Sequence, residues 1–135
     1  MKTYITIHSV VVNDVGEYLV LQRANHRSNP GSWNFITGYI QDRESAEEAA
    51  LRELKEETNL EGEIVKTTNP FWIEEDNIRW VIIASLISMN DTSKLKIDEQ
   101  ESQSCRWIKV DDLLIKQFFP LRKTLGELGI LSLGN

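Results

Sequence analysis

Three glutamates in the middle of the chain have the residue type and spacing of a metal-binding group. Glu53, Glu56 and Glu57 stand at positions i, i+3 and i+4, which a helix places on one face within an arc of about 100°. Like charges this close repel each other, so a nearby positive charge is expected to offset them. Because oxygen ligands suit hard divalent cations, the spacing predicts a site for Mg²⁺ or Mn²⁺. The alternative is a solvated acidic surface, the usual role of a charge run.

A helix with a clear start and end is predicted to carry these acids. Ser45 and Glu48 have the spacing of a capping box, so the helix should begin at Ala46. Asn59 should end it, because asparagine readily adopts the left-handed conformation that commonly follows a helix. An apolar stripe beside the acidic face predicts that the helix packs on a sheet while its acids point into a cleft. The stripe consists of Ala50, Leu51 and Leu54.

The remaining elements predict one α+β domain over residues 1–135. The first two expected strands, residues 4–12 and 18–22, flank a turn-forming sequence and should form a hairpin. The other expected elements, in chain order, are strands at residues 33–38, 62–72, 79–88 and 102–110 and a helix after Pro120.

Length and charge limit the classes of function. The net charge of −6 argues against binding to a nucleic-acid backbone, which needs a basic face, but not against nucleotides, because bound metal ions reverse the local field. The single cysteine, Cys105, excludes an internal disulfide and is expected to be a core thiol. No apolar run approaches the roughly 20 residues of a membrane helix, and no signal-peptide core is visible. A cytoplasmic protein is therefore expected.

The acidic segment resembles the signature of the Nudix hydrolases, G-x5-E-x7-R-E-U-x-E-E-x-G-U, in which U is an aliphatic residue. Residues 38–60 match it at every defined position except the last glycine, which is Asn59 here. The resemblance implies an α/β/α sandwich around a mixed β-sheet. It also implies hydrolysis of a nucleoside diphosphate linked to another group, X, by attack of water on phosphorus.

The resemblance also implies roles for single residues. It places the metal ligands at Glu53, Glu56, Glu57 and the backbone carbonyl of Gly38. Gly38 suits that role because a residue without a side chain lets metal and diphosphate approach the backbone. Glu44 and Arg52 would form an ion pair that holds the acids in place. The residues implied in catalysis are Arg52, Glu53, Glu56 and Glu101.

The general base is left open between one of the helix glutamates and an acid in a later loop. Glu101 resembles the loop acid that many Nudix enzymes carry a few residues before a tryptophan-containing strand, judged by its spacing to Trp107. Glu99 is the rival, and an ordinary charged loop is the alternative to both.

Two further residues are predicted to bind substrate. Arg23, more than its loop neighbours His26 and Arg27, has the chemistry to hold phosphate oxygens, although a solvated loop would also explain it. Trp33 is a candidate to stack on a base, whereas aromatic residues in strands more often belong to the core.

The Thr37-Gly38 pair after Trp33 resembles the corresponding segment of dihydroneopterin triphosphate pyrophosphatases and their relatives. The expected function is that of a Mg²⁺-dependent pyrophosphohydrolase that cleaves a nucleoside or pterin triphosphate, or another nucleoside diphosphate-X compound. The alternative is a catalytically silent Nudix-like domain that binds a nucleotide and regulates a partner. The expected partner is a small nucleotide or related diphosphate, with no nucleic-acid polymer and no membrane, and a homodimer is left open.

Overall fold

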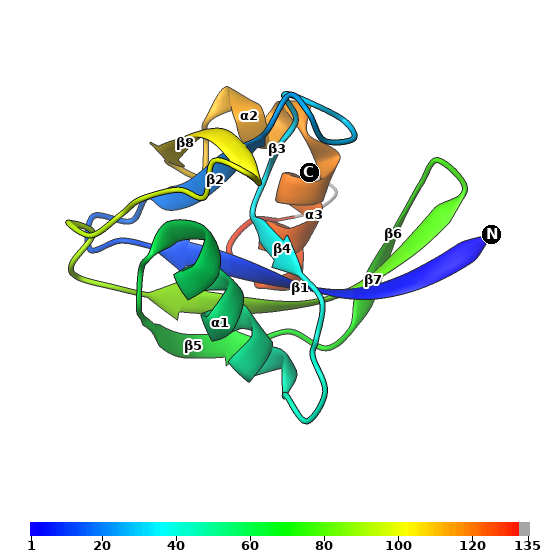
Figure 1. Cartoon of the computed structure of the whole chain (residues 1–135), viewed down its shortest axis with the longest axis horizontal. Coiled ribbons are helices and arrows are strands. Elements are labelled where there is room, and N and C mark those ends of the chain that lie inside the picture. The colour runs from blue at the N-terminus through cyan, green and yellow to red at the C-terminus, as the bar shows by residue number, and fades with distance from the viewer. Residues whose placement is uncertain (133–135) are drawn as a thin grey trace.

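The computed structural model describes residues 1–132, which form an eight-stranded mixed β-sheet with helices on both of its faces (Figure 1). The elements in chain order are β1 (Lys2–Val12), β2 (Tyr18–Arg23), β3 (Trp33–Asn34), β4 (Ile36–Gly38), α1 (Ala46–Thr58), β5 (Glu63–Thr67), β6 (Phe71–Glu75), β7 (Ile78–Ser88), β8 (Ser102–Ile108), α2 (Leu113–Gln117) and α3 (Phe119–Glu127). Among the described residues, no helix is long and apolar enough to cross a membrane.

The central pair of the sheet is β1 and β7, which run parallel in unbroken register from Lys2 opposite Ile78 to Val12 opposite Ser88. Both strands are buried without a break over part of their length, β1 over residues 6–11 and β7 over residues 84–87, as expected where a parallel pair is covered on both faces. β7 also pairs with β5 and β6, and β1 pairs with the short edge strand β4.

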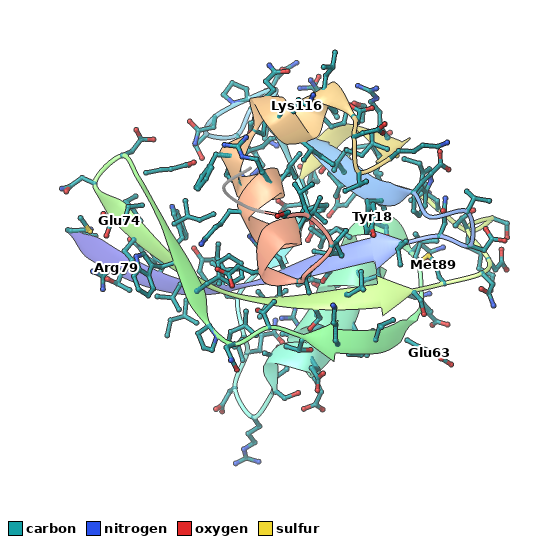
Figure 2. The ribbon with its side chains drawn as sticks, turned by 180° about the vertical axis from the view of Figure 1, so that it is seen from behind. Tyr18, Glu63, Glu74, Arg79, Met89 and Lys116 are labelled. Carbon is teal, nitrogen blue, oxygen red and sulfur yellow. The ribbon has the colours of Figure 1, made fainter. Side chains whose placement is uncertain are left out.

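Alternate residues of β1 face two different cores. Ile7 and Val11 belong to the core under α1, which also contains Ala50 and Leu54 of the predicted apolar stripe. Val10 belongs to the core on the other face, under α2 and α3, where the side chains of α3 fill the space above the sheet (Figure 2). Because successive strand residues point to opposite faces, this one strand anchors both helical layers.

Helix α1 begins and ends where the sequence predicts. Ser45 accepts a hydrogen bond from the Glu48 backbone, and the Glu48 side chain accepts one from the Ser45 backbone, which completes the capping box. Asn59 ends the helix in the left-handed region, at φ 63°. Cys105 packs half-buried against the core beneath α1, as expected for a core thiol, and burial raises the pKa of its thiol.

The predicted hairpin of the first two strands is largely wrong. β1 and β2 meet only at Val12 opposite Tyr18, and β2 then pairs along its length with β8, from Tyr18 opposite Ile108 to Arg23 opposite Ser102. β1 diverges because β7 and β4 occupy its two edges.

Three other boundaries differ from the prediction. The strands expected at residues 33–38 and 62–72 are each interrupted and form β3 with β4 and β5 with β6. The C-terminal helical region starts earlier, with α2, whose N-terminus is capped by the side chain of Asp112. Pro120 lies within the first turn of α3, where a missing backbone N–H costs nothing.

Candidate active site

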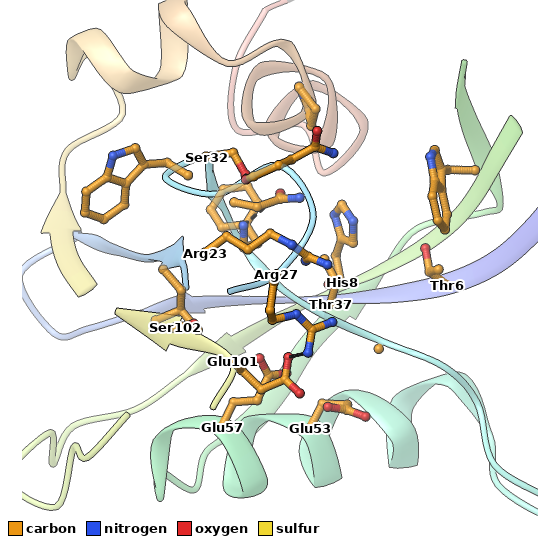
Figure 3. Close-up of a pocket in the computed structure, with 18 of the residues that line it drawn as sticks. Thr6, His8, Arg23, Arg27, Ser32, Thr37, Glu53, Glu57, Glu101 and Ser102 are labelled. Atoms are coloured by element: carbon orange, nitrogen blue, oxygen red, sulfur yellow. Dashed lines mark hydrogen bonds and ion pairs between the residues drawn. The ribbon is translucent and has the colours of Figure 1, made fainter. Parts of the chain in front are cut away.

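A cavity of about 820 Å³ lies beside α1 and the edge strand β4 and extends over the face of β1 and β7. The carboxylates of Glu53, Glu57 and Glu101 gather near α1, whereas His8 and Thr6 project into the cavity from β1 (Figure 3). The cavity therefore joins an acidic region to a wall made by the central strands.

Arg52 supplies the positive charge that the acidic helix face requires. Its Nε and Nη2 donate to the two carboxylate oxygens of Glu44, at 2.7 and 3.0 Å, and Nη2 also donates to the Tyr39 carbonyl at 2.8 Å. Its Nη1 donates to Glu53 at 2.9 Å and to Glu56 at 3.1 Å. The hydrogen bond from Arg52 lowers the pKa of Glu44, and the reciprocal bond raises the pKa of Arg52. One guanidinium thus ties α1 to the segment after β4.

Glu57 is the acid in this group with an unsatisfied buried atom. Within residues 1–132, its buried Oε2 has no hydrogen-bond partner. Burial raises the pKa of Glu57 well above its usual range, and the neighbouring carboxylate of Glu53 raises it further. Such an oxygen is stable only when protonated or when a cation lies beside it.

Gly38 lies directly against the Glu53 carboxylate. A methyl group at this position would overlap the carboxyl carbon of Glu53, so a residue with a side chain would displace the acid. Gly38, Glu53, Glu56 and Glu57 all line the cavity. The oxygen atoms needed for a hard divalent cation are therefore present on one side of it.

The predicted convergence of the three glutamates on one point is not observed. In the part of the chain that the structure describes, no three histidine, cysteine or acidic side chains form a group that could hold a metal ion. Arg52 accounts for the difference, because its Nη1 binds both Glu53 and Glu56 and draws them towards the guanidinium. A metal ion bound by all three would compete with Arg52 for Glu56, whose side chain is 55% exposed.

Two loops bring Arg23, Arg27 and Glu101 to the acidic part of the cavity (Figure 3). Arg27 forms an ion pair of 2.5 Å with Glu101, and both residues line the cavity. Arg23 also lines the cavity and donates from Nε to the Ser28 carbonyl at 2.5 Å. Burial lowers the pKa of Arg23, and the positive charge of Arg27 lowers it further.

The other candidate residues from the sequence differ in whether they line the cavity. Glu101 lines this cavity, whereas Glu99 lines a separate depression beside the end of α1. His26 is exposed and does not line the cavity. Trp33 lines it while Arg106 lies over its ring, 5.7 Å from the ring centre.

Among the cavity residues that sequence reasoning did not single out are Thr6, His8 and Asp98. The two from β1 share one face of the strand, so a strand period of two could have grouped them. No sequence signal showed that this face opens onto the cavity. Asp98 is brought close by its backbone N–H, which donates to the Glu57 carbonyl at 2.9 Å.

A protein-family model described as the NUDIX domain matches residues 3–128. Nucleoside triphosphatase NudI of Escherichia coli O17:K52:H18 (strain UMN026 / ExPEC) is 29% identical over 93% of this chain and 97% of that protein. RNA pyrophosphohydrolase of Ectopseudomonas mendocina (strain ymp) is 47% identical, but over 42% of this chain and 33% of that protein.

Solved structures share the fold at low sequence identity. A MutT NUDIX hydrolase from Burkholderia pseudomallei superposes with a TM-score of 0.78 at 19% identity, covering 95% of this chain and 99% of that one. A C. elegans Ap4A hydrolase superposes with a TM-score of 0.75 at 21% identity, covering 93% and 94%. These likenesses confirm the predicted α/β/α sandwich.

The unsatisfied carboxylate predicts an unusual effect on stability. Glu57→Gln should raise the melting temperature of the metal-free protein at pH 7 by roughly 4 °C, the shift that about 1 kcal/mol gives in a domain of this size. Because the folded-state pKa of Glu57 is raised, its stability contribution is complete below the ordinary glutamate pKa and is lost as pH rises. The amide carries no charge and avoids that loss.

Thermal unfolding in excess chelator, from pH 4 to pH 8, measures the difference. The increase in melting temperature of Glu57→Gln over the unchanged protein should be absent at pH 4 and should grow as the pH rises. Glu56→Gln is the matched control on the same helix, and it should show no such rise because Glu56 is exposed. An increase in melting temperature that is equal at every pH would contradict the raised pKa of Glu57.

Proposed function

This chain belongs to the Nudix hydrolase family, and we propose that it is a Mg²⁺-dependent pyrophosphohydrolase that cleaves a nucleoside or pterin triphosphate to the monophosphate and pyrophosphate. The observation that carries the proposal is the unsatisfied Oε2 of Glu57 next to Glu53 and Gly38 on the cavity wall. A relative that matches 93% of the chain is a nucleoside triphosphatase, which supports a triphosphate substrate.

The proposed metal ligands are Glu53, Glu56, Glu57 and the Gly38 carbonyl, a set of hard oxygen atoms suited to Mg²⁺, with Mn²⁺ as a substitute. When bound there, the cation would neutralise phosphoryl charge, stabilise the leaving group and lower the pKa of a water molecule. The catalytically silent alternative would have no use for a buried carboxylate that is costly without a cation.

Arg52 acts on the reaction through the carboxylates it holds. Its bidentate contact with Glu44 fixes the guanidinium, so its remaining N–H groups orient Glu53. We therefore assign Glu44 and Arg52 to positioning of the metal ligands.

Arg23 is the proposed phosphate-binding residue beside the acidic part of the cavity. Its guanidinium lines the cavity, and a fork of N–H donors suits phosphate oxygens. Arg27 adds a second positive charge beside it, so the two together would balance a polyphosphate chain that enters between them and α1. Trp33 lines the same cavity and is proposed to contact the group beyond the phosphates.

Glu101 is the proposed proton acceptor from the attacking water, with Glu53 as the rival. It faces Glu57 across the acidic part of the cavity, where its charge helps to raise the pKa of Glu57 (Figure 3). Its ion pair with Arg27 keeps its carboxylate at the cavity wall. A phosphate group that took over Arg27 would release Glu101 for proton transfer.

A single cysteine suits a reducing compartment, and we propose the cytoplasm. The homodimer remains a prediction from the sequence.

Metal dependence tests the proposed function directly. Release of pyrophosphate from a panel of nucleoside triphosphates and dihydroneopterin triphosphate should vanish in excess chelator and return with Mg²⁺ or Mn²⁺. Glu57→Gln should lower kcat at least about 100-fold, because the amide cannot supply the negative charge a hard cation needs. Glu61→Gln is the matched control at an exposed acid outside the cavity, and it should keep full activity. Full turnover in excess chelator would overturn the metal mechanism.

The two loop acids provide a separate test of proton transfer. Glu101→Gln should reduce kcat by about 100-fold, the lower range for loss of a general base, while Mn²⁺ binding to the protein is retained. Glu99→Gln should leave kcat unchanged because Glu99 lies outside the cavity. A rate loss confined to Glu99→Gln would reverse the assignment, and no loss in either variant would return proton transfer to the helix glutamates.

A further inference from the structure

We propose that His8 is a specificity-determining residue, which recognises a ring carbonyl group on the substrate's heterocycle by donating a hydrogen bond from Nε2. The inference rests on the proposed function, because it names the class of base that the same cavity accepts. It assigns the wall formed by β1 and β7 to base recognition, away from the carboxylates of α1 (Figure 3).

The position of His8 leaves one ring nitrogen for a ligand. His8 lies in the middle of β1, is 4% exposed, and lines the cavity. Its Nδ1 lies 3.2 Å from Oγ1 of Thr124 on α3, and Thr124 is the only hydrogen-bond partner of the ring within residues 1–132. Nε2 has no hydrogen-bond partner within residues 1–132 and is not among their buried unsatisfied atoms, so it is accessible from the cavity. A polar atom in this position is left for water or for a ligand that enters the cavity.

The contact with Thr124 selects which nitrogen carries the hydrogen. Thr124 is completely buried, and within residues 1–132 its hydroxyl contacts only the His8 ring. If Nδ1 carried the hydrogen, the hydroxyl hydrogen of Thr124 would be buried without an acceptor, which is unfavourable. The hydroxyl therefore donates to Nδ1, and Nε2 carries the hydrogen.

His8 remains a neutral group at physiological pH. Burial lowers the pKa of His8 to about 4, so the ring holds a single hydrogen at pH 7. A neutral ring with its hydrogen fixed on Nε2 donates to a carbonyl oxygen and disfavours an amino group, since two facing N–H groups leave both unsatisfied.

The residues around His8 form a mostly apolar wall. Thr6 stands opposite Ile82 in the register of β1 and β7, and Ile73 of β6 stands opposite Trp80. All four side chains line the cavity, and the Trp80 ring is held by stacking on Tyr4, with ring centres 5.2 Å apart. Such a wall suits a planar heterocycle, and His8 supplies the directional contact on it.

Two pairs of nucleoside monophosphates provide the test, because the members of each pair exchange a ring carbonyl for an amino group. These are IMP against AMP and UMP against CMP. Binding by isothermal calorimetry, without metal, should be at least about tenfold tighter for the carbonyl member of the pair that the cavity accepts. His8→Phe should reduce the preference to less than about twofold by weakening the carbonyl member alone.

Variants at Thr124 distinguish an effect on base recognition from an effect on protein folding. Thr124→Val removes the hydroxyl that fixes the hydrogen on Nε2, so the preference should fall several-fold while His8 is retained. Thr124→Ser keeps the hydroxyl and should keep the preference. If His8→Phe does not fold, this pair of variants still decides the matter, with thermal unfolding as the check on folding.

The outcomes also distinguish the two proposals. A preference for the carbonyl member that disappears in the variants supports the inference, even if no triphosphate is hydrolysed and the proposed function fails. An amino member that binds as tightly as its carbonyl counterpart would overturn the role of His8. Equal weakening of both members by His8→Phe would do the same, because it would show a structural effect only.

Discussion

The organisation of the candidate site depends on the hydrogen bonds of one guanidinium, that of Arg52. It donates two parallel hydrogen bonds to Glu44 and a third to the Tyr39 carbonyl. Its Nη1 donates to Glu53 and Glu56 of α1. A lysine could not satisfy this geometry, because it has no planar fork of donors. Arg52 both offsets the repulsion between the acids and fastens the helix to the loop that leads from Gly38.

The acids and the opposite wall of the cavity are connected through β1. Ile7 and Val11 pack under α1 and so set the height of the acidic helix above the sheet. Thr6 and His8 point to the other face and form the wall that we assign to base recognition. Because residues of one strand alternate between faces, a single rigid element sets the distance between the two parts of the cavity.

The sequence predicted best what depends on neighbouring residues. The limits of α1 followed from Ser45, Glu48 and Asn59, because capping is a local interaction. The hairpin of β1 with β2 was mostly wrong, since strand pairing is decided by distant partners that leave no local mark. The role of His8 was not predicted for the same reason, because its hydrogen-bond partner, Thr124, lies 116 residues away in the chain.

We infer that Glu57 is held in a place that disfavours its charge until a cation binds. The most direct measurement is a pH titration of the Glu57 carboxyl carbon by ¹³C NMR, assigned with Glu57→Gln, in chelator and in saturating Mg²⁺. We expect a pKa well above the ordinary glutamate range in chelator and a carboxylate that is ionised throughout neutral pH with Mg²⁺. An ordinary pKa under both conditions would contradict it.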